Sequence, residues 1–187
     1  MDYIKDGIHF EIVGFFPENF FSKDVNEPFI KEMLETILPK GVWRKGNPNI
    51  YEPDYFYNNI PFEFTIASDK HFIENLRFKS YETQNQEDDV FKYIETSIKK
   101  KVKKKYSTDN VHLCILCLLD MTSWILEDCS QGAFLLVINR KNDFFSLLKE
   151  KYISTGKFSN IFLLFPDMFG SWWVLDVVTA KKKSNST

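Results

Sequence analysis

The sequence contains few cysteines, no long apolar run and little net charge. Its three cysteines are an odd number, and its first residues lack the basic and apolar regions of a signal peptide. These two features predict a reduced, cytoplasmic protein. The longest apolar run, near 111–119, is far shorter than the roughly 20 residues that a membrane span needs, which excludes an integral membrane protein. The formal net charge is only −2, so any affinity for nucleic acid must come from local clusters of basic residues.

Several motifs with a known chemistry are also missing. We find no internal repeat, no Gly-rich phosphate loop and no Ser-His-Asp spacing, and the three histidines lie far apart in the sequence. Cys114 and Cys117 have the CxxC spacing of a zinc site, but no second Cys or His pair follows them. Because a strand sends residues three positions apart to opposite faces, core packing is the favoured interpretation of these two cysteines.

The chain does contain enough apolar surface for one packed domain. Hydrophobic residues make up 44% of its 187 residues, and 19 of them are Phe, which favours a well-packed globule over a disordered chain. The length is that of one domain of ordinary size. We therefore expect a single domain over residues 1–178 and a disordered polar tail over residues 179–187.

Hydrophobic periodicity and turn residues predict a mixture of strands and helices. We expect strands, the first of them possible as a strand pair, at 7–16, 51–57, 60–67, 111–120, 159–165 and 172–178. We expect helices at 27–38, 87–106 and 143–152. Segment 133–138 is either a short strand or a turn of buried helix, 123–126 is compatible with a helix, and 69–86 is unassigned. The apolar run at 111–120 is typical of a strand buried on both faces, whereas one of Trp172 and Trp173 should face outward.

An Asn-Asn pair between two aromatic-rich runs predicts a β-hairpin. The runs are 51–57 and 60–67, and Asn58 and Asn59 between them tolerate the positive φ angles that a two-residue turn requires. Such a turn also determines which residues of the two strands oppose each other.

The hairpin register brings two carboxylates together. With this turn, Asp54 faces Glu63 and Glu52 faces Thr65, and all four share one face because side chains alternate along a strand. Two opposed carboxylates repel by some tenths of a kcal/mol up to about 1 kcal/mol unless something lies between them. A hard cation such as Mg²⁺, which binds one or two carboxylates with water and phosphate oxygens, would suit the pair. The alternative is an amphipathic hairpin whose acidic face merely contacts water.

The predicted helix at 87–106 carries lysines on two different faces. Its apolar stripe is formed by Val90, Phe91, Ile94, Ile98, Val102 and Tyr106. Lys101 and Lys105 fall inside this stripe, where a lysine must pair with an anion or extend its stem to reach water. The other lysines, for which a solvated face is the ordinary explanation, are Lys99, Lys100, Lys103 and Lys104.

The predicted helix at 27–38 contributes further carboxylates. We expect it to begin at Glu27 behind an Asn26 cap and to have Pro28 in its first turn. Glu32 and Glu35 lie at the edge or on the far side of its apolar stripe, where solvated charges are the ordinary explanation. The stripe consists of Phe29, Met33, Leu34, Ile37 and Leu38.

The order of these features resembles the PD-(D/E)xK nuclease superfamily. Between about 27 and 120 the chain runs helix, acidic hairpin, lysine-bearing helix and buried strand, and the hairpin carries Pro53-Asp54 and then Glu63-Phe64-Thr65. The resemblance implies an α/β (α+β), restriction-endonuclease-like fold with a central mixed β-sheet flanked by helices. It also implies hydrolysis of phosphodiester bonds in DNA or RNA with Mg²⁺ or Mn²⁺ as the cofactor.

By motif position, the resemblance assigns the metal ligands. These would be Asp54, Glu63 and the backbone carbonyl of Phe64. An acid on the preceding helix often assists in this family, and it would be Glu32 or Glu35 here. Further accessory candidates are Glu52, Thr65 and Lys105.

The chain departs from the family at the lysine of the second motif. That position holds Thr65, which brings no charge and cannot neutralise a transition state. In some members of the family the lysine has migrated to a neighbouring helix, and the candidate replacement here is Lys101, with Lys105 second. The same helix would contact nucleic acid through its remaining lysines, Lys99, Lys100, Lys103 and Lys104.

Three functions are open from the sequence. The first is a Mg²⁺-dependent nuclease, with Asp54 and Glu63 holding the metal, Lys101 beside the nucleophile and a homodimer as a common assembly of this fold. The second, suggested by Thr65 and the low net charge, is a catalytically inactive member that binds nucleic acid or protein. The third, suggested by the high aromatic content, is a protein-interaction factor of an immunity or defence type.

Overall fold

The computed structural model describes residues 8–11, 22–68, 87–119, 131–166 and 171–179. Its strands are β1 (Ile8–Glu11), β2 (Trp43–Lys45), β3 (Tyr55–Tyr57), β4 (Ile60–Ser68), β5 (His112–Leu118), β6 (Asn160–Pro166) and β7 (Ser171–Asp176). Its helices are α1 (Lys23–Ile37), α3 (Glu87–Val102), α4 (Gln131–Asn139) and α5 (Lys141–Leu148), with a 3₁₀ turn η2 (Pro48–Ile50) and a π-helical turn η4 (Lys149–Ile153). The predictions for 12–16, 69–86 and 123–126, and for the tail beyond 179, lie outside the described residues.

The strands form one mixed sheet in the order β1-β7-β6-β5-β4-β3-β2. The central strands β4, β5 and β6 run parallel, and β2, β3 and β4 form an antiparallel meander at one edge. At the opposite edge β7 pairs antiparallel with both β6 and β1. Parallel neighbours need a crossover connection, and α3 lies in the connection between β4 and β5. The α/β class and the succession of helix, hairpin, helix and buried strand are therefore confirmed.

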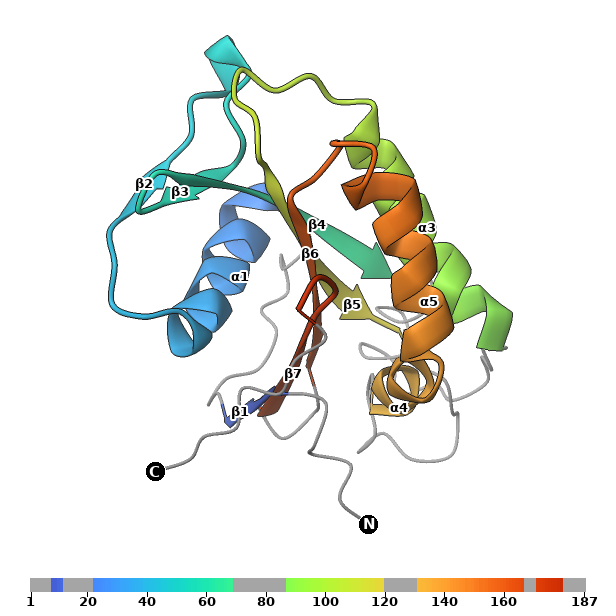
Figure 1. Ribbon diagram of the computed structural model, residues 1–187. Coiled ribbons are helices and arrows are strands. Elements are labelled where there is room, and N and C mark those ends of the chain that lie inside the picture. The colour runs from blue at the N-terminus through green and yellow to red at the C-terminus, as the bar shows by residue number, and fades with distance from the viewer. Residues whose placement is uncertain (1–7, 12–21, 69–86, 120–130, 167–170, 180–187) are drawn as a thin grey trace.

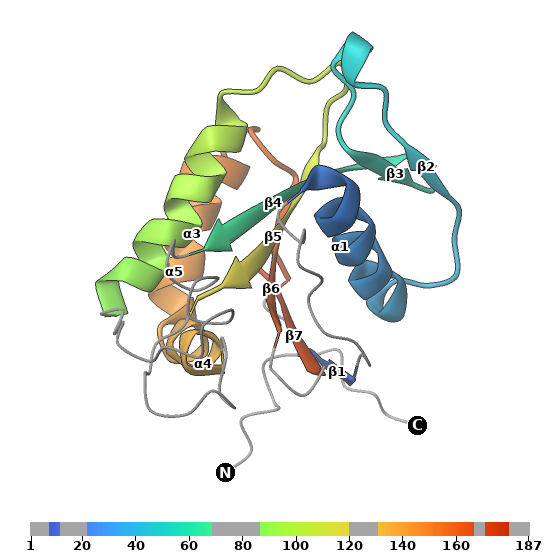
Figure 2. The same ribbon diagram turned by 180° about the vertical axis from the view of Figure 1, so that it is seen from behind.

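Helices cover both faces of the sheet. Figures 1 and 2 show α1 on one face and α3, α4 and α5 on the other. Leu34 of α1 belongs to the same buried cluster as Phe64 and Cys114, whereas Ile94 of α3 belongs to the cluster that contains Cys117. The two cysteines thus lie on opposite faces of β5, and β5 is buried on both faces as its apolar sequence predicted.

Helix α1 begins earlier than the sequence predicted. Ser22 is the residue before the helix, and its carbonyl accepts bonds from both the backbone N–H and the side-chain amide of Asn26. Asn26 therefore lies within the helix and does not cap it, and Pro28 lies beyond the first turn. The residues of the expected apolar stripe all pack against the core, but the prediction omitted Ile30, which is fully buried.

Helix α3 is shorter than predicted, since it ends at Val102 and not at Tyr106. The N–H of Lys104 donates to the carbonyl of Lys101 at 3.0 Å, which closes one last turn before the chain leaves the helix. Val90, Ile94 and Ile98 of the expected stripe are fully buried. The three lysines that follow Val102 therefore do not share the helical geometry on which their predicted faces were based.

The described residues 131–153, between β5 and β6, are largely helical. Residues 131–139 form α4, which decides between the two alternatives for 133–138, and the helix expected at 143–152 is α5 with the π-helical turn that follows it. Among the described residues, no helix combines the length and the apolar character that a membrane crossing requires.

The expectation that one of Trp172 and Trp173 faces outward is wrong. The two residues point to opposite faces of β7, and both are buried, with 3% and 9% of their surfaces exposed. The reason is that core residues cover both faces of the sheet at this strand. The alternation of side chains was correct, but both sides of the strand are interior.

Candidate functional site

The β3–β4 hairpin brings the two predicted carboxylates together. Asn58 and Asn59 have φ angles of 46° and 68°, as a type I′ turn requires, and the strands pair in the expected register. One residue before β3, this register puts Asp54 opposite Glu63. The side chain of Glu63 is 0% exposed and that of Asp54 is 8% exposed. The pair is therefore a buried feature and not an acidic face that contacts water.

The backbone of β4 presents a third oxygen at the edge where Asp54 lies. The ladder between β3 and β4 ends at Tyr55, and the N–H of Phe64 donates instead to Oδ2 of Asp54 at 2.8 Å. The N–H and C=O of a strand residue point toward the same neighbouring strand, so the Phe64 carbonyl is directed to this edge as well. Its partner in a continued ladder would be Pro53, which has no N–H to donate.

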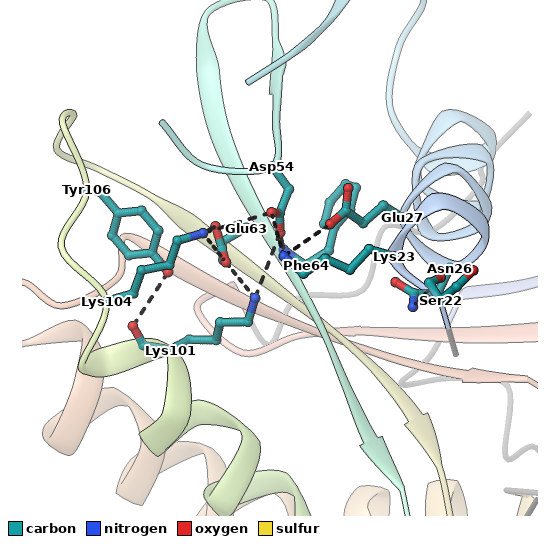
Figure 3. A network of polar contacts seen from close by, with 10 residues as sticks. All are labelled: Ser22, Lys23, Asn26, Glu27, Asp54, Glu63, Phe64, Lys101, Lys104 and Tyr106. Atoms are coloured by element: carbon teal, nitrogen blue, oxygen red, sulfur yellow. Dashed lines mark hydrogen bonds and ion pairs between the residues drawn. The ribbon is translucent and has the colours of Figure 1, made fainter. Parts of the chain in front are cut away.

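Two lysines of the α3 end reach Glu63. The Lys101 ammonium lies 2.5 Å from Glu63 Oε1 and 3.9 Å from Asp54 Oδ2. The Lys104 ammonium lies 2.9 and 3.0 Å from the two oxygens of Glu63 and 3.9 Å from Asp54 Oδ1 (Figure 3). Thr65 lies on the Glu63 face of β4 without a charge, and Lys101 brings an ammonium from the neighbouring helix to the pair.

The sequence analysis placed two lysines wrongly, and Lys104 is the one that belongs to the site. It was assigned to a solvated helix face, but α3 has already ended at Val102, and the turn directs the Lys104 side chain to Glu63. Lys105, which was expected to be the second lysine of the site, is exposed. Lys100 and Lys103 are exposed too, and Lys99 pairs with Glu95 of the same helix at 3.2 Å.

The acid that α1 contributes is Glu27, which the sequence analysis missed. Glu32 and Glu35, the expected accessory acids, are exposed, whereas Glu27 is buried and points toward Asp54 (Figure 3). Burial raises the pKa of Glu27, and the negative charge of Asp54 raises this pKa further, against the opposing effects of nearby lysines. A signal was available, because Glu27 stands three residues before Ile30 and therefore on the buried face of the helix.

Glu52 lies beside the site but holds the loop that delivers Asp54. The Glu52 carboxylate accepts bonds from Arg44 at 2.9 and 3.1 Å and from the backbone N–H of Asn47 at 2.8 Å. These bonds, the Arg44 pair above all, lower the pKa of Glu52. The predicted pairing of Glu52 with Thr65 is not formed, because β3 begins only at Tyr55.

Gly46 is required in the same loop. Its N–H donates to the carbonyl of Asp54 at 2.9 Å, and a Cβ at this position would lie 1.7 Å from the carbonyl oxygen of Pro53. No side chain larger than hydrogen fits there unless the backbone moves. The close approach of these two segments places Asp54 at the start of the hairpin.

Tyr106 forms one wall of the site. Its ring lies 5.3 Å from the Lys104 ammonium, and its hydroxyl is 3.5 Å from the carbonyl of Lys101 (Figure 3). Burial raises the pKa of Tyr106, and the negative charges of Glu63 and Asp54 act in the same direction. Tyr106 is therefore a neutral hydrogen-bonding group and not a source of charge.

The fold and these contacts define a three-layer α/β protein with a buried cluster of two carboxylates and two ammonium groups at one end of the sheet. Within the residues that the structure describes, no group of three or more His, Cys, Asp or Glu side chains is placed to hold a metal ion. Comparison of the chain with protein-family models, with curated proteins and with solved structures finds no match.

Proposed function

We propose that this protein is a nuclease of restriction-endonuclease-like fold that hydrolyses phosphodiester bonds with Mg²⁺ or Mn²⁺. One observation carries the proposal: Asp54 and Glu63 are buried beside each other, and the Lys101 ammonium lies within 4.0 Å of both. The order of α1, the β3–β4 hairpin, α3 and β5 supports the same assignment. Burial of two carboxylates costs free energy that an acidic cluster on the surface would not cost, and a catalytic role gives a reason for this cost.

The donor set at this edge fits a hard divalent cation. Mg²⁺ is commonly bound through one or two carboxylates, with waters and substrate phosphate oxygens completing its shell, and the Asp54 and Glu63 carboxylates with the Phe64 carbonyl provide such oxygens. When bound, the ion would polarise a phosphate oxygen and lower the pKa of a water molecule. Glu27, held beside Asp54 by α1, could accept bonds from waters of that shell.

Lys101 supplies positive charge where the reaction develops negative charge. In hydrolysis a water oxygen bonds to phosphorus, the bond to the leaving oxygen breaks, and the leaving oxygen takes up a proton. Negative charge on the phosphate oxygens increases in the transition state, and a preorganised ammonium in a buried site stabilises it more than water does. Lys101 is suited to this role, because the last turn of α3 holds it and only 16% of its side chain is exposed.

The test is cleavage and metal binding in matched variants. Asp54→Ala and Glu63→Ala are each expected to abolish Mn²⁺ binding in calorimetry and to abolish cleavage of DNA or RNA substrates. Lys101→Met is expected to lower the cleavage rate by roughly a hundredfold or more while the protein still binds metal. Glu32→Gln and Glu35→Gln serve as controls and should behave as wild type. Carboxylate variants that remain folded by circular dichroism and still cut as well as wild type would refute the proposal.

A second candidate is a catalytically inactive member of this fold that binds nucleic acid. The favouring observation is that the two ammonium groups of Lys101 and Lys104 balance the charges of the Asp54 and Glu63 carboxylates. This candidate predicts binding that weakens steeply with salt, no metal-dependent cleavage, and no loss of binding in Asp54→Ala. Metal-dependent cleavage by the wild type would exclude it.

A further inference from the structure

The two ammonium groups at Glu63 are held in different ways. Lys101 belongs to the last turn of α3 and contacts one oxygen of Glu63. Lys104 follows the helix end, contacts both oxygens of Glu63 and has 34% of its side chain exposed, compared with 16% for Lys101. Lys104 can therefore leave toward solvent on its flexible stem, whereas Lys101 is the more enclosed of the two.

The position of the Lys104 ammonium conflicts with a bound divalent cation. A metal shared by Asp54 and Glu63 must lie within reach of oxygens of both residues. Lys101 is hydrogen-bonded to Oε1 of Glu63 and lies nearest Oδ2 of Asp54, whereas Lys104 lies 2.9 and 3.0 Å from the two oxygens of Glu63 and 3.9 Å from Oδ1 of Asp54. Lys104 is therefore the ammonium that covers Oε2 of Glu63 and Oδ1 of Asp54. An ammonium and a metal ion cannot occupy one set of oxygens, since like charges at this separation repel strongly in a buried site.

We propose that Lys104 is a displaceable internal cation, which occupies the metal position until a phosphate group of the substrate attracts it away. This inference rests on the proposed function. The exposed neighbours Lys103 and Lys105 would hold a nucleic-acid phosphate close to the Lys104 stem. Metal and nucleic acid would then each increase the affinity of the protein for the other, because such coupling is reciprocal.

The pairing of Lys104 also sets the size of the expected effect. A charge-assisted hydrogen bond contributes enough free energy for the Lys104 ammonium to occupy the carboxylates most of the time. Metal can bind only to the fraction of molecules in which the carboxylates are free, so the apparent affinity for metal is reduced in proportion to that fraction. Removing the Lys104 ammonium should therefore strengthen metal binding in the absence of nucleic acid by roughly ten- to a hundredfold.

The test is calorimetric titration of Mn²⁺ into the protein without nucleic acid. Lys104→Met is expected to bind Mn²⁺ at least roughly tenfold more tightly than wild type, which is the lower end of the expected ten- to hundredfold gain. Lys104→Arg, which retains the charge, and Lys103→Met, which removes a neighbouring exposed charge, should both bind as wild type does. Adding Glu63→Ala to Lys104→Met should abolish the gain.

Each outcome bears on a different proposal. If wild type and Lys104→Met bind Mn²⁺ equally tightly, the proposed role of Lys104 is overturned and the metal site is left standing. The same holds if Lys103→Met gains as much Mn²⁺ affinity as Lys104→Met, because that result would indicate a general effect of charge. Binding by Lys104→Met alone supports the inference. No Mn²⁺ binding by any variant, Lys104→Met included, overturns both the inference and the metal-dependent nuclease.

Discussion

At the scale of single residues, Glu63 has the most demanding environment of the site. Its carboxylate is fully buried, and burial of a charge is unfavourable unless the charge is paired and hydrogen-bonded. Lys101 and Lys104 supply both conditions from one helix end. The need to pair Glu63 also explains why Lys101 lies in the apolar stripe of α3, because its aliphatic stem packs in the stripe while its ammonium reaches Glu63.

Glu27 provides a stability test at the same scale. Because its pKa is raised by burial and by Asp54, the folded state binds the Glu27 proton more tightly than the unfolded state does. Stability is then lost as the pH rises from the unfolded pKa, near 4.5, through the folded pKa. We expect Glu27→Gln to raise the melting temperature at pH 7, with a difference from wild type that shrinks below pH 4.5.

The matched control for Glu27 is Glu32, an exposed acid of the same helix. Glu32→Gln should leave the melting temperature at pH 7 unchanged. A lower melting temperature for Glu27→Gln at pH 7, measured by circular dichroism, would show that the ionised Glu27 stabilises the fold, for example through its 3.6 Å ion pair with Lys23.

At the scale of elements, the β3–β4 turn determines which carboxylates meet. Both turn residues have positive φ, which costs a non-glycine residue roughly 1–2 kcal/mol, although Asn pays less than most. Asn58 has a second role, because its side-chain oxygen accepts the N–H of Val42 at 2.9 Å and so ties the start of β2 to the turn. Among the described residues, the Asn59 side chain makes no corresponding bond to the start of β2.

The two asparagines therefore predict different responses to glycine. Asn59→Gly should stabilise the protein by a few tenths of a kcal/mol, because glycine adopts positive φ without steric cost. Asn58→Gly should be less stable than Asn59→Gly by about 0.5–1.5 kcal/mol, the net value of one hydrogen bond. Urea unfolding monitored by tryptophan fluorescence measures both. Equal stability of the two variants would show that the bond to Val42 contributes nothing.

The end of α3 is the second element that shapes the site. Had the helix continued to Tyr106, Lys104 would have stayed on its solvated face. The chain instead leaves the helix after Val102, and the free energy of pairing Glu63 offsets the helical bonds that are lost. Lys105, which helical geometry assigned to the buried stripe, is exposed for the same reason.

At the scale of the whole molecule, a net charge of −2 gives no general attraction for nucleic acid. Any affinity must come from local clusters of basic residues, and one such cluster lies near the site. Lys103 and Lys105 are exposed, whereas Lys99 is already paired with Glu95.

These lysines lead to a prediction about salt dependence. Lys103→Ala and Lys105→Ala should each weaken binding across sequences and reduce the slope of log affinity against log salt by about 0.7–0.9, the value for one phosphate contact. Lys99→Ala should change the slope less, since Glu95 competes for its charge. Fluorescence anisotropy at several salt concentrations provides the measurement. Slopes that are unaffected in all three variants would place the nucleic-acid surface elsewhere.

Much of the fold follows from local patterns along the chain. The turn at Asn58-Asn59 and the alternation of the hairpin correctly predicted the meeting of Asp54 with Glu63, and the continuous apolar run of β5 correctly predicted a strand buried on both faces. Neighbouring residues contain this information, because backbone sterics relate a two-residue turn to the positions that oppose each other.

Local patterns failed where burial or a helix end depended on distant contacts. The burial of both Trp172 and Trp173 depends on what covers the two faces of β7. The roles of Glu27 and Lys104 depend on where α1 begins and where α3 ends, and helix ends are set by small energy differences that tertiary contacts can reverse.

The local sequence alone determines the register of the hairpin, and this register determines which two carboxylates meet, because both follow from the geometry of adjacent residues. The identity of the cations beside that pair, and the acid behind it, were decided by how α1 and α3 pack on the sheet. The physical reason is that a buried charge selects its partners by proximity in space, and the sequence records that proximity only through the folded chain.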